Sequence, residues 1–286
     1  MSTSRIFAAA AFLSLGAAAA LAEPEPEASV TSPWVEMHAS RVRLLASEAK
    51  TAGGARLAGL EIVLDDGWKT YWRMPGDAGV PPQHDWSGSV NAAQVKVLYP
   101  APKRIPEAGG EVIGYKGTVL FPIEVTPQDP ARPVALKLAL ELGVCREICV
   151  AATAKLDLML PPAGKAAQRA GQKDAIAAAL ERVPRPHTAR RPADPKLVQV
   201  SLNDGTSGAR LIVQAAFGGA NGGDVFVEAP DGIYVPMLRK QPQAADGTVR
   251  FTSDLAPDLV RDLKGKALTL TLVSEAGASE AQRAFP

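Results

Sequence analysis

The chain has 286 residues, of which 47% are hydrophobic and 5% aromatic, and it contains 24 prolines. Its 31 basic and 30 acidic residues nearly balance, which gives no electrostatic reason to expect nucleic acid or an anionic membrane surface as a partner. Many prolines and few aromatic residues argue against a helical bundle, and the length suffices for two small hydrophobic cores.

Residues 1–22 are predicted to be a signal peptide. Arg5 is followed by an Ala-, Leu- and Phe-rich stretch that ends in Ala20-Leu21-Ala22, a small-residue cleavage site. No later segment approaches about 18 uninterrupted apolar residues, so we expect no membrane span. The sequence therefore predicts an exported, periplasmic protein that is cleaved near Ala22, in a compartment where disulfides form.

Residues 30–162 are predicted to fold as one β-sandwich domain, because short segments with period-two alternation follow one another with turn signals between them. Pro122 lies inside one of these segments and predicts an edge strand there. The alternating segments are residues 56–64, 93–98, 118–125, 134–142 and 155–160.

The only two cysteines, Cys145 and Cys149, lie in the sequence VCREIC at residues 144–149, between the last two alternating segments. Four residues of extended strand span roughly 13 Å, whereas a disulfide needs Cα atoms within about 7 Å. If the cysteines bond, residues 146–148 must form the turn of a hairpin. Arg146 would favour a thiolate beside it, and Glu147 would oppose one.

This spacing leaves three interpretations open. Closing so short a loop removes only roughly 2 kcal/mol of unfolded-state entropy, which makes a purely structural disulfide less favoured than an exchange-active one. A structural bond and a metal-binding pair remain alternatives. The histidines His38, His84 and His187 are scattered and lack the local spacing of a zinc site, so we predict no metal site and no cofactor.

Residues 163–195 are predicted to join two domains. Alternation stops there, residues 175–180 favour a short helix, and a Pro- and Arg-rich linker follows. Residues 196–286 resume the alternation and are predicted to form a second, cysteine-free β-sandwich. Its predicted strands are residues 197–202, 209–214, 224–228, 233–238, 248–251 and 267–273.

Several ordered motifs together resemble the amino-terminal periplasmic domain of DsbD-type disulfide reductases, and the ScsB branch most closely. They are GWKTYWRMPGDAGVPP at residues 67–82, Trp86, YPAPKR at residues 99–104, Gly114-Tyr115 and VCREIC at residues 144–149. The resemblance implies two immunoglobulin-like β-sandwiches, which is the all-β fold class that the alternation also favours.

The resemblance further implies a thiol carrier, a component of a protein-disulfide reductase, with Cys145 and Cys149 as its catalytic pair. Such a pair takes electrons from a thioredoxin-like partner and passes them to oxidised exported proteins. A cap loop shields the cysteines in DsbD, and by order along the chain it would fall at residues 111–117, with Glu111 and Tyr115 as candidate contacts. This sequence contains no membrane electron-conducting or thioredoxin-like domain, so we expect the electron donor to be a separate protein.

Two other functions fit the residues. Two thiolates on one turn can hold Cu(I), with Met74 or Met159 assisting, which would make the chain a copper-binding protein. The chain could instead be a noncatalytic binding module with a structural disulfide. Trp68, Tyr71 and Trp72 could line a partner groove, but large aromatic residues beside a strand are more typical of a core.

Overall fold

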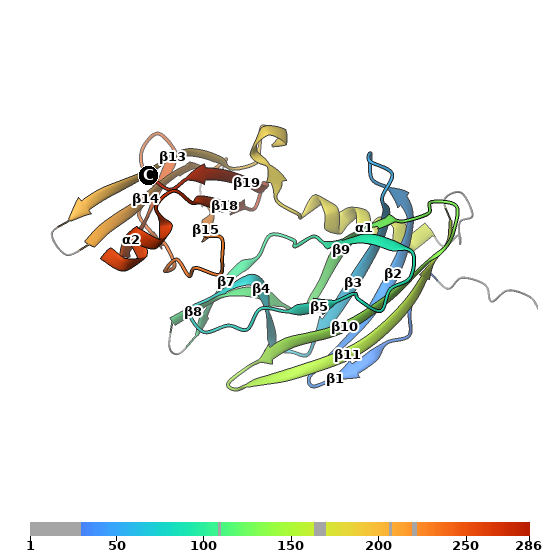
Figure 1. Ribbon diagram of the computed structural model, residues 1–286. Helices are drawn as coiled ribbons and strands as arrows, with labels where there is room; N and C mark the ends of the chain where they lie inside the picture. Colours follow the sequence, from blue (N-terminus) through green and yellow to red (C-terminus); the bar gives the residue numbers. More distant parts are fainter. Residues whose placement is uncertain (1–29, 108–109, 163–169, 206–207, 219–221) are drawn as a thin grey trace, which may run out of the picture.

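The computed structural model describes residues 30–107, 110–162, 170–205, 208–218 and 222–286, and the predicted signal peptide lies outside these ranges. Within these ranges, four sheets form two β-sandwiches, accompanied by two short helices (Figure 1), so the predicted all-β class is confirmed. The strand pairs are antiparallel except for the parallel pair of β12 with β19. Neither helix in the described ranges is long and apolar enough to cross a bilayer.

The first sandwich packs two sheets against each other. One sheet has the order β1-β2-β3-β9-β6, and the other has the order β11-β10-β4-β8-β7 with β5 added to β10. The strands are β1 (Val35–Met37), β2 (Ser40–Lys50), β3 (Arg56–Leu64), β4 (Lys69–Gly76), β5 (Gln83–Asp85), β6 (Ala92–Val97), β7 (Lys103–Glu107), β8 (Gly110–Lys116), β9 (Thr118–Pro127), β10 (Val134–Cys145) and β11 (Cys149–Leu160).

The core of the first sandwich follows from the alternation read in the sequence. Along β10, residues Val134, Leu136, Leu138 and Leu140 are all buried, while the residues between them are more exposed. They pack with residues of the facing sheet into one hydrophobic cluster. Burial of each such side chain stabilises the fold by roughly 1.5–3 kcal/mol.

The second sandwich packs sheet β12-β19-β18-β15 against sheet β13-β14-β17-β16. Its elements are β12 (Arg185–Pro186), β13 (Lys196–Gly205), β14 (Gly208–Ala216), β15 (Asp224–Glu228), β16 (Arg239–Lys240), β17 (Thr248–Leu255), β18 (Ala267–Ser274) and β19 (Gly277–Ala284), with the helix α2 (Pro257–Leu263) and the 3-10 turn η1 (His187–Ala189). A separate buried cluster fills it.

Helix α1 (Ala170–Glu181) packs on the outer face of the first sandwich, over β2, β3 and β9 (Figure 1). Ile176 of the helix is buried against Leu45 and Leu57. Gly59 permits this approach, because a Cβ atom there would lie 3.3 Å from Ile176 and 2.8 Å from Leu120. The segment after the helix contacts the second sandwich instead, where Arg185 pairs with Ser279 of β19.

Three predicted features of the strands differ from the structure. Residues 233–238 are not a strand, because Pro236 lacks the N–H that a ladder needs. A different segment, Gly277–Ala284, forms β19, which no alternation predicted. Pro122 lies in β9, which is an interior strand and not the predicted edge strand. β6 pairs with β9 only from Ile123 onward. The backbone N–H that Pro122 lacks is therefore at the point where the pairing with β6 stops.

Candidate functional site

Cys145 and Cys149 form a disulfide at the tip of the β10–β11 hairpin. Cys145 ends β10, Cys149 begins β11, and the two are register partners with their Cα atoms 4.1 Å apart. The predicted turn at residues 146–148 is therefore confirmed, and the Arg146 N–H donates to the Ile148 carbonyl across it at 3.1 Å. The long alternating segments on both sides fix this register and so bring the sulfurs together.

The two cysteines differ in exposure. Cys145 is 1% exposed and belongs to a small buried cluster with Tyr71, Ile105 and Val112. Cys149 is exposed, and the neighbouring Ile148 is 70% exposed. Cys149 is therefore the cysteine that an incoming partner can contact, whereas Cys145 is enclosed by the protein.

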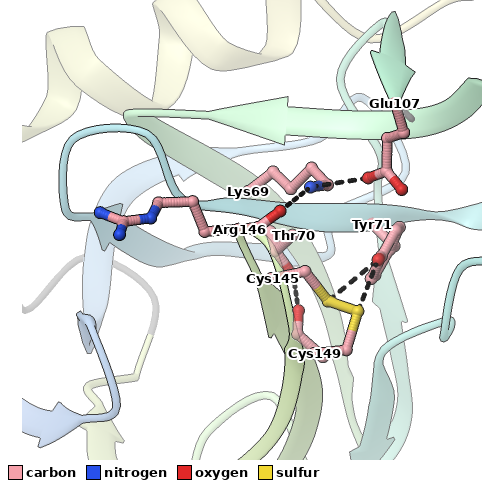
Figure 2. Close-up of a disulfide and its surroundings, with 8 residues drawn as sticks. Lys69, Thr70, Tyr71, Glu107, Cys145, Arg146 and Cys149 are labelled. Atoms are coloured by element: carbon pink, nitrogen blue, oxygen red, sulfur yellow. Dashed lines mark hydrogen bonds and ion pairs between the residues drawn. A yellow bond between two sulfur atoms is a disulfide. The ribbon is translucent and has the colours of Figure 1, made fainter.

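Tyr71 of β4 contacts both sulfurs (Figure 2). Its hydroxyl donates to the Cys145 Sγ at 2.9 Å and lies 3.2 Å from the Cys149 Sγ. Burial and then the negative charge of Glu107 raise the pKa of the Tyr71 phenol, which keeps it protonated and able to donate near neutral pH. A phenol placed this way can stabilise a thiolate that leaves from Cys145.

Glycines make room for the Tyr71 ring. A Cβ atom on Gly79 would lie 2.6 Å from the ring, and one on Gly143 would lie 3.1 Å from it. Gly143 precedes Cys145 by two residues, so the ring reaches the sulfurs by lying against a strand that has no side chain at that point. Val80, which is 51% exposed, also lies against Gly143 and borders the site with Ile148.

An ion pair supports the turn from behind. Lys69 of β4 is the register partner of Cys145; its Nζ donates to the Arg146 carbonyl at 3.2 Å and pairs with Glu107 of β7 at 2.6 Å. The Lys69 side chain is only 6% exposed, so this pair is held in a partly desolvated place. The Arg146 guanidinium extends away from the sulfurs (Figure 2) and lies over the Trp68 ring, 5.7 Å from its centroid.

The structure places the two candidate cap residues away from the disulfide. The segment predicted as a cap loop, residues 111–117, is mostly strand β8. Tyr115 is the register partner of Thr70, so it shares Thr70's face of the sheet and points into the core, where its hydroxyl donates to the Pro100 carbonyl. Tyr71, one residue further along β4, points to the opposite face and takes the place expected for Tyr115.

Glu111 pairs with Arg104 at 2.7 Å, on the side that faces the second sandwich. The residues that do surround the disulfide, Lys69, Tyr71 and Glu107, were not singled out as site residues from the sequence. Period-two alternation could have separated Tyr71 from Trp72, since neighbours on a strand face opposite sides. It could not have indicated which face holds the cysteines.

The structure gives the methionines no place beside the cysteines. Met159 lies near the far end of β11, roughly 33 Å along the strand from Cys149. Met74 lines a small cavity beside Met237 of the second sandwich. Across the parts of the chain that are described, no three His, Cys, Asp or Glu side chains gather in a way that could hold a metal ion.

Comparison with known proteins bears on the same segment. Residues 41–161 match the family model described as the N-terminal part of the thiol:disulfide interchange protein DsbD. The crystal structure of the N-terminal periplasmic domain of ScsB from Proteus mirabilis is similar over 90% of this chain and 98% of that chain, with a TM-score of 0.66 and 24% sequence identity. A search of curated proteins finds no match. Residues 41–161, which include the strands that carry the disulfide, thus match the DsbD N-terminal family, and the chain shares the fold of the ScsB periplasmic domain.

Proposed function

We propose that the chain is a periplasmic thiol–disulfide exchange protein, which passes electrons between thioredoxin-like partners through Cys145 and Cys149. The observation that carries the proposal is the asymmetry of the disulfide: one exposed cysteine, one buried cysteine, and a protonated phenol in contact with both sulfurs. A bond that only stapled the hairpin would need none of these features. The match of residues 41–161 to the DsbD N-terminal family supports the same chemistry.

The exchange follows from this geometry. A thiolate of a reduced partner attacks the Cys149 Sγ, the Cys145–Cys149 bond breaks, and Cys145 leaves as a thiolate that accepts the Tyr71 hydrogen bond. The partner's second thiolate then attacks its own sulfur in the mixed disulfide and releases Cys149 as a thiolate. Two electrons have moved from the partner to the pair, and the reduced Cys149 can attack an oxidised protein by the reverse steps.

The site leaves room for a partner at the exposed sulfur. Ile148, next to Cys149 in the chain, and Val80, which lies against Gly143, present exposed apolar side chains, while the Lys69 side chain of the Lys69–Glu107 ion pair is only 6% exposed. We infer a partner that docks mainly through apolar contact and brings one reactive cysteine to Cys149. Thioredoxin-like proteins of the periplasm are the partners that we propose.

Trapping tests the proposal. Cys145→Ser keeps the exposed thiol and removes the one that would resolve a mixed disulfide, so it should form a stable covalent complex with a thioredoxin-like protein that keeps only its attacking cysteine. The remaining cysteine of each variant is first activated with dithiobis(nitrobenzoate), which leaves a mixed disulfide with thionitrobenzoate; the partner's thiolate displaces thionitrobenzoate, and the complex is measured on a nonreducing gel. Cys149→Ser, which keeps only the buried thiol, is the matched control and should react at least roughly tenfold more slowly.

Two results would count against the proposal. A complex from Cys149→Ser alone would reverse the assignment of the attacked sulfur. If neither variant forms a complex, while the reduced wild-type chain binds one Cu(I) ion tightly, copper binding would replace thiol exchange as the function.

A further inference from the structure

Strand β15 has two different faces. Val225 and Val227 point into the core of the second sandwich, while Asp224, Phe226 and Glu228 alternate with them and point out of it. Phe226 is only 2% exposed and packs in the core cluster of the first sandwich. We call Asp224, Phe226 and Glu228 the anchor strip, because all three contact the first sandwich.

The anchor strip holds strand β4. Glu228 accepts two hydrogen bonds from the Arg73 guanidinium, both at 2.8 Å, and Glu280 of β19 also pairs with Arg73. Burial alone would lower the pKa of Arg73, but the hydrogen bonds and charges of the two carboxylates raise it above its ordinary value. The Phe226 ring lies 5.7 Å from the ring of Trp72, which precedes Arg73 on the same strand.

The anchor strip also holds strand β7. Asp224 accepts two hydrogen bonds from the Arg104 guanidinium, both at 2.8 Å, and the Arg104 guanidinium lies over the Phe226 ring. Two forked arginine–carboxylate pairs, one at each end of five residues, fix both the distance and the orientation of the two strands that they bind.

These two strands are the ones that support the disulfide. β4 carries Tyr71, two residues or about 7 Å before Arg73, and β7 carries Glu107, three residues after Arg104. After β4 the chain passes over the Tyr71 ring at Gly79, and on this path Asp77 accepts a hydrogen bond from Tyr234 of the second sandwich. Tyr71 therefore lies on a segment whose next residues, Arg73 and Asp77, are both bound by the second sandwich.

We propose that the second sandwich is a positioning domain for the cysteine pair: through the anchor strip it fixes β4, and with it the hydroxyl of Tyr71 that the reduced Cys145 needs. The disulfide itself holds the sulfurs in place when the pair is oxidised. When the pair is reduced, only the surrounding contacts hold the Cys145 thiolate, so a looser β4 destabilises the reduced form more than the oxidised one. Glu228 and Arg73 act here through Tyr71 and touch neither sulfur.

The test measures the reduction equilibrium of the full chain in dithiothreitol buffers, with the reduced fraction read as the mass shift after alkylation. Glu228→Gln keeps the shape of the side chain and removes its charge. We expect its equilibrium constant for reduction to fall roughly tenfold, about 30 mV toward more negative potential. Asp254→Asn is the matched control, because Asp254 pairs with Arg210 at the exposed surface of the same sandwich, and it should change the constant less than about twofold.

The same substitution in a Tyr71→Phe variant separates an effect on the position of Tyr71 from a general loss of stability. In Tyr71→Phe the hydroxyl is absent, so adding Glu228→Gln should then shift the constant by less than about twofold. If Glu228→Gln does not fold, Arg73→Lys, which keeps the charge but loses the fork, takes its place. An unchanged constant in the folded variants, or an equal shift with and without the Tyr71 hydroxyl, would overturn the inference.

The inference gives a further role to the site of the proposed function, and the two can fail separately. Dithiothreitol needs no protein partner, so a shift in Glu228→Gln would stand even if no thioredoxin-like protein reacts. Conversely, a trapped partner together with an unshifted constant would leave the exchange function and remove the positioning role.

Discussion

Tyr71 is the residue whose position most depends on its surroundings. Its hydroxyl reaches both sulfurs because Gly79 and Gly143 leave space for the ring on either side. The sequence identified the two cysteines, since no other residues offered redox chemistry, but a strand tyrosine between other aromatic residues reads as core. Tyr71 is indeed buried, and only the fold shows that its polar end lies at the disulfide.

Replacing Tyr71 by Phe removes that hydroxyl and little else. A hydrogen bond to a charged group contributes about 1.5–3 kcal/mol, so we expect the rate of disulfide reduction by dithiothreitol at neutral pH to fall at least roughly tenfold. The control is Tyr115→Phe, whose hydroxyl donates to the Pro100 carbonyl on the opposite face of the sheet and should leave the rate unchanged. Equal effects of the two substitutions would contradict the role given to Tyr71.

At the scale of strands, alternation predicted some strands that bury large apolar side chains and missed others, such as β2 with the buried Val42 and Leu44. It predicted the bounds of β3 and β15. It also missed β19, whose buried residues are the small Ala278, Ser279 and Ala281, and whose Ser279 hydroxyl donates to the Pro195 carbonyl. Small residues and a hydrogen-bonded serine give no apolar period, so only pairing with β18 shows the strand.

Strand β5 provides a test by pH. Burial lowers the pKa of His84 from 6.5 to about 4, and the ring packs edge-on against Tyr99. Between these values the unfolded chain binds a proton that the folded chain does not, so stability is full above pH 6.5, falls as the pH drops toward 4, and stops falling below it. The loss should be at most about 3 kcal/mol.

Urea unfolding at several pH values between 4 and 7.5 measures this effect. All four tryptophans, at positions 34, 68, 72 and 86, lie in the first sandwich, and of these Trp72 also contacts Phe226 of the second, so their fluorescence mainly follows the unfolding of the first sandwich. His84→Gln should lose most of the pH dependence, and His187→Gln, beside the second sandwich, should keep it. A wild-type chain that is equally stable at pH 7 and pH 4.5 would refute this role of His84.

For the whole molecule, the composition and motifs predicted two sandwiches, but not how the joining segment divides between them. Helix α1 packs on the first sandwich through Ile176, and the chain from Arg185 onward pairs with β19. Linker composition marks where alternation stops, and it does not say which neighbour each half contacts. The contacts of the anchor strip could not be predicted from the sequence either, because charged residues on the outer side of a strand are typical of a solvent-exposed face.

We therefore expect the boundary between the two domains to lie between Glu181 and Arg185. Arg182 is exposed there, so limited trypsin digestion of the full chain should cut after it and leave two protected fragments, identified by mass spectrometry. The Arg73 and Arg104 pairs should keep the fragments together at low salt, and high salt should separate them. One protected fragment that spans residues 170–196 would argue against this boundary.

The reduction potential of the Cys145–Cys149 pair tests the proposed thiol exchange most directly. Titration of the full chain against a thiol buffer of known potential measures it. An exchange-active pair that closes a short, exposed turn should have a reduction potential within the range of thioredoxin-like proteins, above about −300 mV, so that such partners can both reduce it and be reduced by it. A potential well below about −300 mV, with no reduction by a thioredoxin-like protein, would show a structural bond and contradict the account.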